Sequence, residues 1–178
     1  SSAASDVYKR QIQCFERRWG GLAQMVSLED VERAQQEWGD GIVAISGAHR
    51  NGGDYIGIAT NHINTLYAYQ IGPVMFKPTL AAIDQFRPTF ESALSYFVAS
   101  NNACPEDAGF AIKGWTNVRF ENHKVTTDGN RAFAMGNYFF TDTEGTEVKV
   151  EYTFGYIEDE DSNLRIQLHH SSVPAATN

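Results

Sequence analysis

Two shortages, of cysteine and of basic residues, exclude several classes of protein. The chain has 2 cysteines in 178 residues. Cys14 and Cys104 lie far apart without a His or Cys neighbour at metal-ligand spacing, so neither a zinc knuckle nor a disulfide framework is indicated, although a single bridge stays open. Lysine and arginine number 14 against 22 aspartates and glutamates, which gives a net charge of −8. Because nucleic acids and anionic membranes bind basic surfaces, neither is expected as a partner.

Long apolar runs are also missing. No run approaches the ~18 residues that a membrane-spanning helix needs. The first residues, SSAASDVYKRQ, are too polar for a signal peptide, and we interpret them as partly a cloning remnant. Since the length suits one domain of ordinary size, we expect a tail over residues 1–26, a single domain over residues 27–174 and a short tail over residues 175–178.

Three helices are predicted in the first hundred residues. The first begins at Ser27, a typical N-cap residue, because apolar residues then recur at helical spacing. Gly39 and Gly41 lie inside it and indicate the close approach of another helix or of a ligand, with packing the favoured interpretation. The second helix is expected to end at Gly72-Pro73. The predicted helices span residues 27–48, 54–72 and 87–100, and a short strand spans residues 74–79.

The second half of the chain is typical of β-strands. Four runs rich in β-forming residues, the first of them FAIKGWTNVRFENHKVTT, are separated by the turn sequences TDGN, DTEGT and EDEDSN. Helices followed by a meander of strands predict an α+β fold, in which a curved, cone-shaped antiparallel sheet is covered on its concave face by the three N-terminal helices. A cone of this kind encloses a cavity.

The last predicted strand, LRIQLHHSSVP, carries two histidines and two serines in adjacent pairs. Side chains on a strand alternate between its faces. Counting along the apolar face from Leu164 places His170 and Ser172 inside the cavity. A bulge would add one residue and exchange the faces, so His169 with Ser171 is the alternative.

Several segments in the same order resemble one family. The order of elements resembles the nuclear transport factor 2-like cone fold. Between about Val31 and Pro174 the chain is similar to iota-class carbonic anhydrases of algae and bacteria. The segments that carry the similarity are QEWGDGIVAI, LYAYQIGPVMFKPTLAA, ALSYFV, AMGNYFFTD, VKVEYTFGY and LHHSSVP. The resemblance implies reversible hydration of CO2 to bicarbonate, in a class where some members act without a metal. It leaves the compartment open between a plastid and a bacterial cytoplasm or periplasm.

The resemblance also implies a site. Metal-free members hold bicarbonate with a Thr, a Tyr and a Ser near a His, which correspond here to Thr79 in KPT, Tyr96 in LSYF, and Ser172 with His170 in HHSS. We expect these four to be catalytic, with Thr79, Tyr96 and Ser172, or Ser171, binding substrate. Hydroxyl donors would stabilise charge on the CO2 oxygens, and a neutral His170 would polarise the attacking water or accept its proton.

A metal is not expected, with zinc or manganese as the alternative. Metal-dependent carbonic anhydrases use the ion to lower the pKa of bound water. His169 and His170 point to opposite faces of a regular strand and cannot both bind one ion. No carboxylate or thiol lies at a recognisable ligand spacing, although His62 could join one of the two.

Small molecules and a second copy of the chain are the expected partners, and two other functions are considered as alternatives. CO2 and bicarbonate are the expected small-molecule partners, and a homodimer is expected because Phe133, Tyr138 and Phe140 would need cover on the outer sheet face. One alternative is an association domain without activity. Another is a lyase or isomerase acting on a larger organic ring, which would need a carboxylate base in the cavity.

Overall fold

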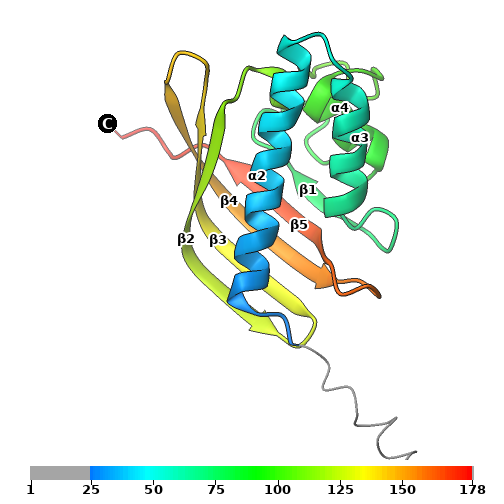
Figure 1. Cartoon of the computed structure of the whole chain (residues 1–178), viewed down its shortest axis with the longest axis vertical. Coiled ribbons are helices and arrows are strands. Elements are labelled where there is room, and N and C mark those ends of the chain that lie inside the picture. The colour runs from blue at the N-terminus through cyan, green and yellow to red at the C-terminus, as the bar shows by residue number, and fades with distance from the viewer. Residues whose placement is uncertain (1–24, 178) are drawn as a thin grey trace, which may run out of the picture.

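The computed structural model describes residues 25–177 (Figure 1). The predicted N-terminal tail therefore lies outside the described residues except for Met25 and Val26, and Cys14 lies outside them as well. Val26 is buried, and its backbone N–H donates to the carbonyl oxygen of Gly129 over 3.0 Å. Within the described part of the chain, no helix is both long and apolar enough to span a bilayer.

The first helix forms where the sequence places its N-cap. Ser27 caps α2 by accepting from the backbone N–H of Asp30, whose carboxylate accepts in return from Ser27. Asp54 and Thr89 cap α3 and α4 in the same manner, through a side-chain oxygen. The helices are α2 (Leu28–Arg50), α3 (Tyr55–Leu66) and α4 (Phe90–Val98).

The second helix ends earlier than the Gly72-Pro73 pair predicts. Tyr67 already has extended backbone angles, φ −106° and ψ 153°. The next backbone N–H, of Ala68, donates to the carbonyl oxygen of Ile166 over 2.9 Å. A hydrogen bond to a distant strand thus replaces the last turn that local sequence would favour, and it turns Tyr67 into the core.

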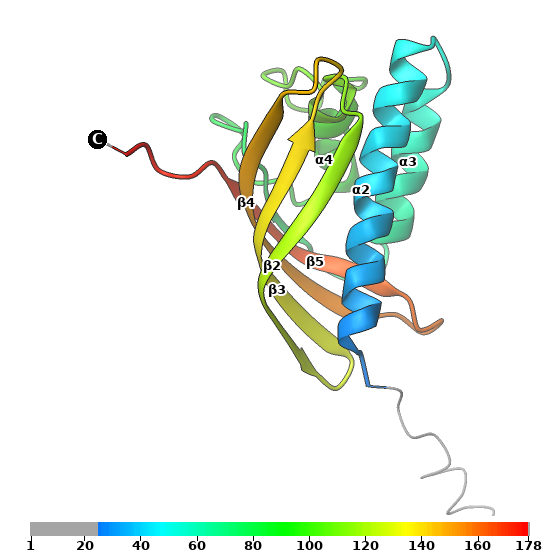
Figure 2. The ribbon, with the colours of Figure 1, turned by 60° about the vertical axis from the view of Figure 1, so that its left-hand side comes forward.

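The strands form one curved sheet in the order β1-β5-β4-β3-β2. Neighbours are antiparallel except β1, which pairs in parallel with β5. Figure 2 shows that the sheet bends around the helices, with α2 lying along its concave side. The predicted α+β cone is therefore confirmed, although residues 110–112 form a single 3-10 turn where a strand was expected. The strands are β1 (Met75–Lys77), β2 (Asn117–Asp128), β3 (Arg131–Thr141), β4 (Glu147–Glu158) and β5 (Leu164–Ser172).

The two glycines of α2 mark close packing, as expected. A Cβ atom on Gly39 would lie 3.2 Å from the Cβ atom of Val118 on β2. A Cβ atom on Gly41 would overlap Nδ1 of His62 on α3. Glycine at these positions lets α2 approach both the sheet and the neighbouring helix.

Candidate active site

The orientation of β5 depends on one extra residue. Gly155 on β4 pairs with Leu168, but the next residue, Tyr156, pairs with Ile166, so Gln167 has no partner of its own. This is a β-bulge, which reverses the faces of the residues beyond it. His169 and Ser171 therefore face the interior, each 2% exposed.

The expected inward positions of His170 and Ser172 are wrong. His170 is exposed, and the hydroxyl of Ser172 donates to the carboxylate of Glu151 over 2.9 Å on the outer side of the sheet. Strict alternation from Leu164 fails because it does not account for the bulge at Gln167. The alternative pair, His169 and Ser171, is the one that the structure places in the interior.

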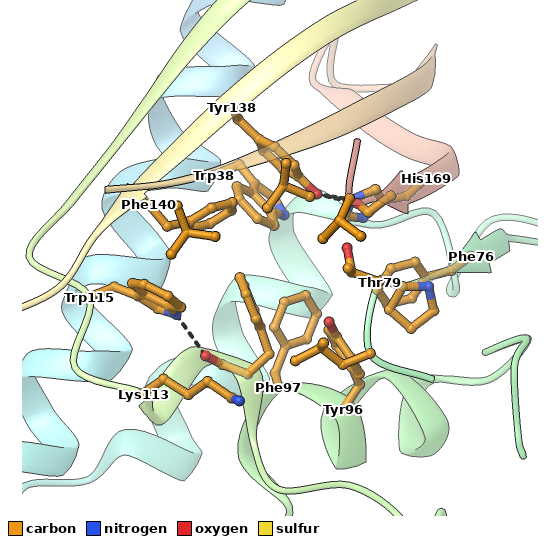
Figure 3. Close-up of a pocket in the computed structure, with 17 residues that line it drawn as sticks. Trp38, Phe76, Thr79, Tyr96, Phe97, Lys113, Trp115, Tyr138, Phe140 and His169 are labelled. Atoms are coloured by element: carbon orange, nitrogen blue, oxygen red, sulfur yellow. Dashed lines mark hydrogen bonds between the residues drawn. The ribbon is translucent and has the colours of Figure 1, made fainter. Parts of the chain in front are cut away.

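His169 and Ser171 line a cavity of about 190 Å³ in the mouth of the cone (Figure 3). A water molecule occupies about 30 Å³ in the liquid, so there is room for a small substrate and some water, whereas sites for drug-sized ligands start at about 300 Å³. No carboxylate is among the lining residues. Most of the wall is apolar and includes Phe97, Phe110, Trp115, Phe140, Val148 and Val150.

Thr79 and Tyr96 line the same cavity. Thr79 follows β1, and Tyr96 lies on α4, where it is 5% exposed. Figure 3 shows Thr79 between His169 and Tyr96, with Tyr96 across the cavity from Tyr138. The structure thus brings together the Thr and Tyr predicted from the resemblance.

Buried Arg87 fixes the loop that carries Thr79. Its guanidinium Nη2 donates to Asp107 over 2.7 Å, and Nη1 donates to the backbone oxygen of Ser92 on α4 over 3.0 Å. Its own backbone N–H donates to the carbonyl oxygen of Phe76 over 2.8 Å. A buried, fully hydrogen-bonded arginine holds its partners in one geometry, and here it joins β1 to α4.

The polar groups on the sheet side form a cluster of three side chains, Tyr138, His169 and Ser171, which we call the hydroxyl cluster. Nε2 of His169 lies 3.0 Å from Oγ of Ser171 and 3.3 Å from the Tyr138 hydroxyl. The Tyr138 and Ser171 hydroxyls are also hydrogen-bonded to each other. The cluster therefore presents hydroxyl groups to an otherwise apolar space.

Burial keeps the side chains of Tyr96, Tyr138 and His169 neutral. It raises the pKa of the Tyr138 hydroxyl, and the hydrogen bond with Ser171 offsets this in part. Burial likewise raises the pKa of Tyr96. Burial lowers the pKa of His169 well below its usual 6.5, and the neighbouring His170 and His62 lower it further. At neutral pH the tyrosines are therefore hydrogen-bond donors and the imidazole is uncharged.

Sequence reasoning missed Tyr138, which was expected on the outer face together with Phe140. Both are buried, at 3% and 1% exposure, and both line the cavity. The sequence held a signal for this. Ala132 and Ala134 lie at even spacing from Tyr138 and Phe140 on β3 and so share their face, and small residues suit the inside of a cone. Lys113 was also missed; it is exposed and lies at the rim of the cavity.

No group of three or more His, Cys, Asp or Glu side chains within residues 25–177 is arranged to hold a metal ion. A family model described as metal-independent carbonic anhydrase matches residues 29–173. The chain belongs to this family. It is thus a carbonic anhydrase, as the resemblance implied, and the family is one that acts without a metal.

Two relatives support this assignment. The carbonic anhydrase is 41% identical over 152 residues to a metal-independent carbonic anhydrase of Nostoc sp., a match that covers 84% of this chain and 74% of the relative. Its structure is similar to the crystal structure of an iota-carbonic anhydrase from a cyanobacterium in complex with bicarbonate, with a TM-score of 0.83 and 38% identity, over 86% of this chain and 95% of that one.

A more distant structure shares the fold of this carbonic anhydrase alone. A Streptomyces avermitilis protein described as a dehydratase of the nuclear transport factor 2-like family has a TM-score of 0.53 at 12% identity, over 84% of this chain and 96% of that one. The likeness supports the predicted cone fold.

Proposed function

We propose that the chain catalyses the reversible hydration of CO2 to bicarbonate in this cavity, with hydroxyl groups doing the work of a metal ion. One observation carries the proposal: Thr79, Tyr96 and the hydroxyl cluster converge on an apolar cavity lined by no carboxylate. Thr79 and Tyr96 keep the roles expected from the resemblance. The roles expected of His170 and Ser172 pass to His169 and Ser171.

The apolar wall suits CO2, which has no net dipole and is easily desolvated. When a water oxygen attacks the carbon, one C–O σ bond forms and one C=O π bond breaks. The electron pair of the π bond gives negative charge to the CO2 oxygens, and the water gives up a proton. Hydroxyl donors already directed at those oxygens stabilise this charge, and each such donor is worth about 3 kcal/mol in a transition state. Thr79, Tyr96 and the hydroxyl cluster supply these donors around the cavity.

The released proton leaves through the mouth of the cavity to solvent. No lining carboxylate is present to accept it. His169 is a poor base because burial lowers its pKa. We therefore assign His169 to holding the hydroxyls of Tyr138 and Ser171, in place of the water-polarising role expected of His170.

Bicarbonate, the product of hydration, is the proposed ligand of the same groups. The cyanobacterial relative was crystallised in complex with bicarbonate, which supports this assignment. In this chain the oxygens of bicarbonate would accept hydrogen bonds from the hydroxyls of Thr79, Tyr96 and Ser171. A ring lyase or isomerase is not favoured, because the cavity of about 190 Å³ is small and lacks a carboxylate base.

The adjacent serines of β5 provide a matched test. Ser171→Ala removes a donor inside the cavity and should lower kcat/KM for CO2 hydration about a hundredfold. Ser172→Ala removes a similar hydroxyl on the outer face and should stay within about twofold of the parent. Stopped-flow CO2 hydration measures both.

Equal rates for the two variants would contradict the proposed site. The protein is treated with a chelator beforehand. Loss of activity that zinc or manganese restores would contradict the metal-free mechanism, whereas retained activity supports it. Absence of CO2 hydration in the parent would contradict the proposal as a whole.

We also propose that two copies associate through the outer face of the sheet. Phe133 and Met135 on β3 are 48% and 53% exposed on this face, and large apolar side chains grouped on a surface favour cover by another chain. Sedimentation analysis should give the mass of two chains for the parent and of one chain for Phe133→Glu. A parent that sediments as a monomer at micromolar concentration would contradict this.

A further inference from the structure

Behind the hydroxyl cluster, Trp38 and Tyr67 form a relay that ends on His169. Nε1 of Trp38 lies 3.0 Å from the hydroxyl oxygen of Tyr67, and that oxygen lies 2.8 Å from Nδ1 of His169. The three side chains are 1%, 1% and 2% exposed, so bulk water does not compete for these hydrogen bonds. The proposed substrate contacts use neither Trp38 nor Tyr67.

The direction of each hydrogen bond follows from the indole, which can donate but cannot accept. Trp38 therefore donates to the oxygen of Tyr67, and the hydroxyl proton of Tyr67 needs another acceptor. The acceptor within reach is Nδ1 of His169. If Nδ1 carried a proton, the Tyr67 hydroxyl would be a buried donor without an acceptor, an arrangement that folded proteins avoid.

We propose that Trp38 and Tyr67 are positioning residues that fix His169 in the tautomer with its proton on Nε2, so that the hydroxyl cluster is a hydrogen-bond donor toward the cavity. The tautomer itself is independent of the proposed function. Only its catalytic consequence rests on that function.

The consequence follows from counting protons in the cluster. With the proton on Nε2, His169 donates to Ser171, over 3.0 Å, or to Tyr138, over 3.3 Å. The bond between Tyr138 and Ser171 uses one of their two hydroxyl protons. The other proton is left for a substrate oxygen. With the proton on Nδ1, Nε2 would accept one hydroxyl proton and the Tyr138–Ser171 bond would use the second, which leaves none for the substrate.

Aromatic packing holds the imidazole in the plane that this relay requires. The ring of Phe76 is stacked on His169, with centroids 4.6 Å apart and planes inclined by 12°. The ring of Phe154 meets it edge-on at 4.4 Å and 69°. Burial also opposes a second proton on the ring, because it lowers the pKa of His169. The imidazole is therefore fixed in place and uncharged.

The tautomer can be measured on the unmodified protein. In protein labelled with 15N-histidine at pH 7.5, a long-range 1H–15N correlation spectrum should show His169 as a neutral ring protonated at Nε2. The His169 signals are those that disappear in His169→Gln. A ring protonated at Nδ1, or at both nitrogens, overturns the proposal, and this result does not depend on whether any variant is active.

Tyr67→Phe tests the relay itself. It removes the donor to Nδ1, so the 15N resonance of Nδ1 should move to the position of a nitrogen without a hydrogen bond. Tyr69→Phe is the matched control: Tyr69 is stacked on Tyr67 but its hydroxyl donates to the backbone oxygen of Arg87. The Nδ1 resonance should not move in the control. An Nδ1 resonance that Tyr67→Phe leaves in place overturns the proposal.

Two substitutions of His169 separate a donor from a base. In His169→Gln the side-chain oxygen can accept from Tyr67 and the amide can donate to Ser171, so the hydrogen-bond pattern is kept, although an amide cannot take up the proton of water. His169→Met fills similar space without a donor. We expect kcat for CO2 hydration within about tenfold of the parent for Gln and a loss of about a hundredfold for Met.

Equal losses in the two variants overturn the donor role. Thermal unfolding shows whether both variants are folded. If one of them is not, the spectrum of the parent still decides the tautomer. Undiminished activity in Ser171→Ala would instead contradict the proposed site. The tautomer would then be judged by the spectra alone. The two failures can therefore be told apart.

Discussion

His62 and His169 show how burial sets the chemistry of single residues. His62 on α3 is 5% exposed, its Nε2 has no hydrogen-bond partner within the described residues, and Trp38 lies beside it with ring centroids 6.0 Å apart. Burial lowers the pKa of His62 to about 4. Burial also lowers the pKa of His169, but His169 has hydrogen bonds at both ring nitrogens. One histidine is a packing residue and the other belongs to the site.

Because burial lowers the pKa of both histidines, we predict that the free energy of unfolding falls in mild acid. In the unfolded chain each binds a proton near pH 6.5, but the folded chain resists protonation down to about pH 4 at His62. The unfolded state therefore holds more protons in this window, and the free energy of unfolding decreases as pH falls, by about 1.4 kcal/mol per pH unit for each histidine. Urea unfolding at pH 7.5, 6 and 5 measures this slope.

His62→Leu should reduce that slope, because one titrating group is gone. Ile63→Val is the control: it deletes a neighbouring buried methyl group, costs about 1 kcal/mol at every pH and leaves the slope unchanged. A slope for His62→Leu equal to that of the parent would show that His62 is protonated in the folded state.

At the scale of elements, the glycines of α2 decide how closely the layers approach. Gly41 lies against the ring of His62, whereas a Cβ atom on Gly47 would have only the end of the Arg50 side chain near it, at 3.8 Å. Both glycines weaken the helix by similar amounts compared with alanine. Only one of them is needed for packing.

Gly41→Ala should therefore destabilise the protein and Gly47→Ala should not. The new methyl group at position 41 would overlap His62, and overpacking of this kind costs about 1–3 kcal/mol. Gly47→Ala should gain up to about 1 kcal/mol from helix propensity. Urea unfolding of the two variants measures the difference, and equal changes in stability would contradict the packing role of Gly41.

Element boundaries were predictable where local chemistry decides them. Ser27 caps its helix as the sequence indicates. The end of α3 was not, because a hydrogen bond from Ala68 to the distant Ile166 decides it. The bulge at Gln167 was weighed only as an alternative, since nothing within LRIQLHHSSVP distinguishes a bulged strand from a regular one.

At the scale of the whole molecule, the fold was predictable because its helices and strands each agree with their local sequence. Thr79 and Tyr96 were found through the resemblance, which compares segments and does not depend on the register of a strand. The relay from Trp38 through Tyr67 to His169 was not predicted, because its hydrogen bonds join α2, the end of α3 and β5. Such contacts depend on the packed cone and leave no local pattern.

The paired histidines and serines of β5 have a consequence for how the cavity tolerates change. Residues 169 and 171 face inward in the bulged strand, and residues 170 and 172 would face inward in a regular one. Either arrangement offers the cavity one imidazole and one hydroxyl, in the same order along the strand. An insertion or deletion of one residue upstream in β5 would thus exchange the individual side chains while conserving the chemical composition of the cavity wall.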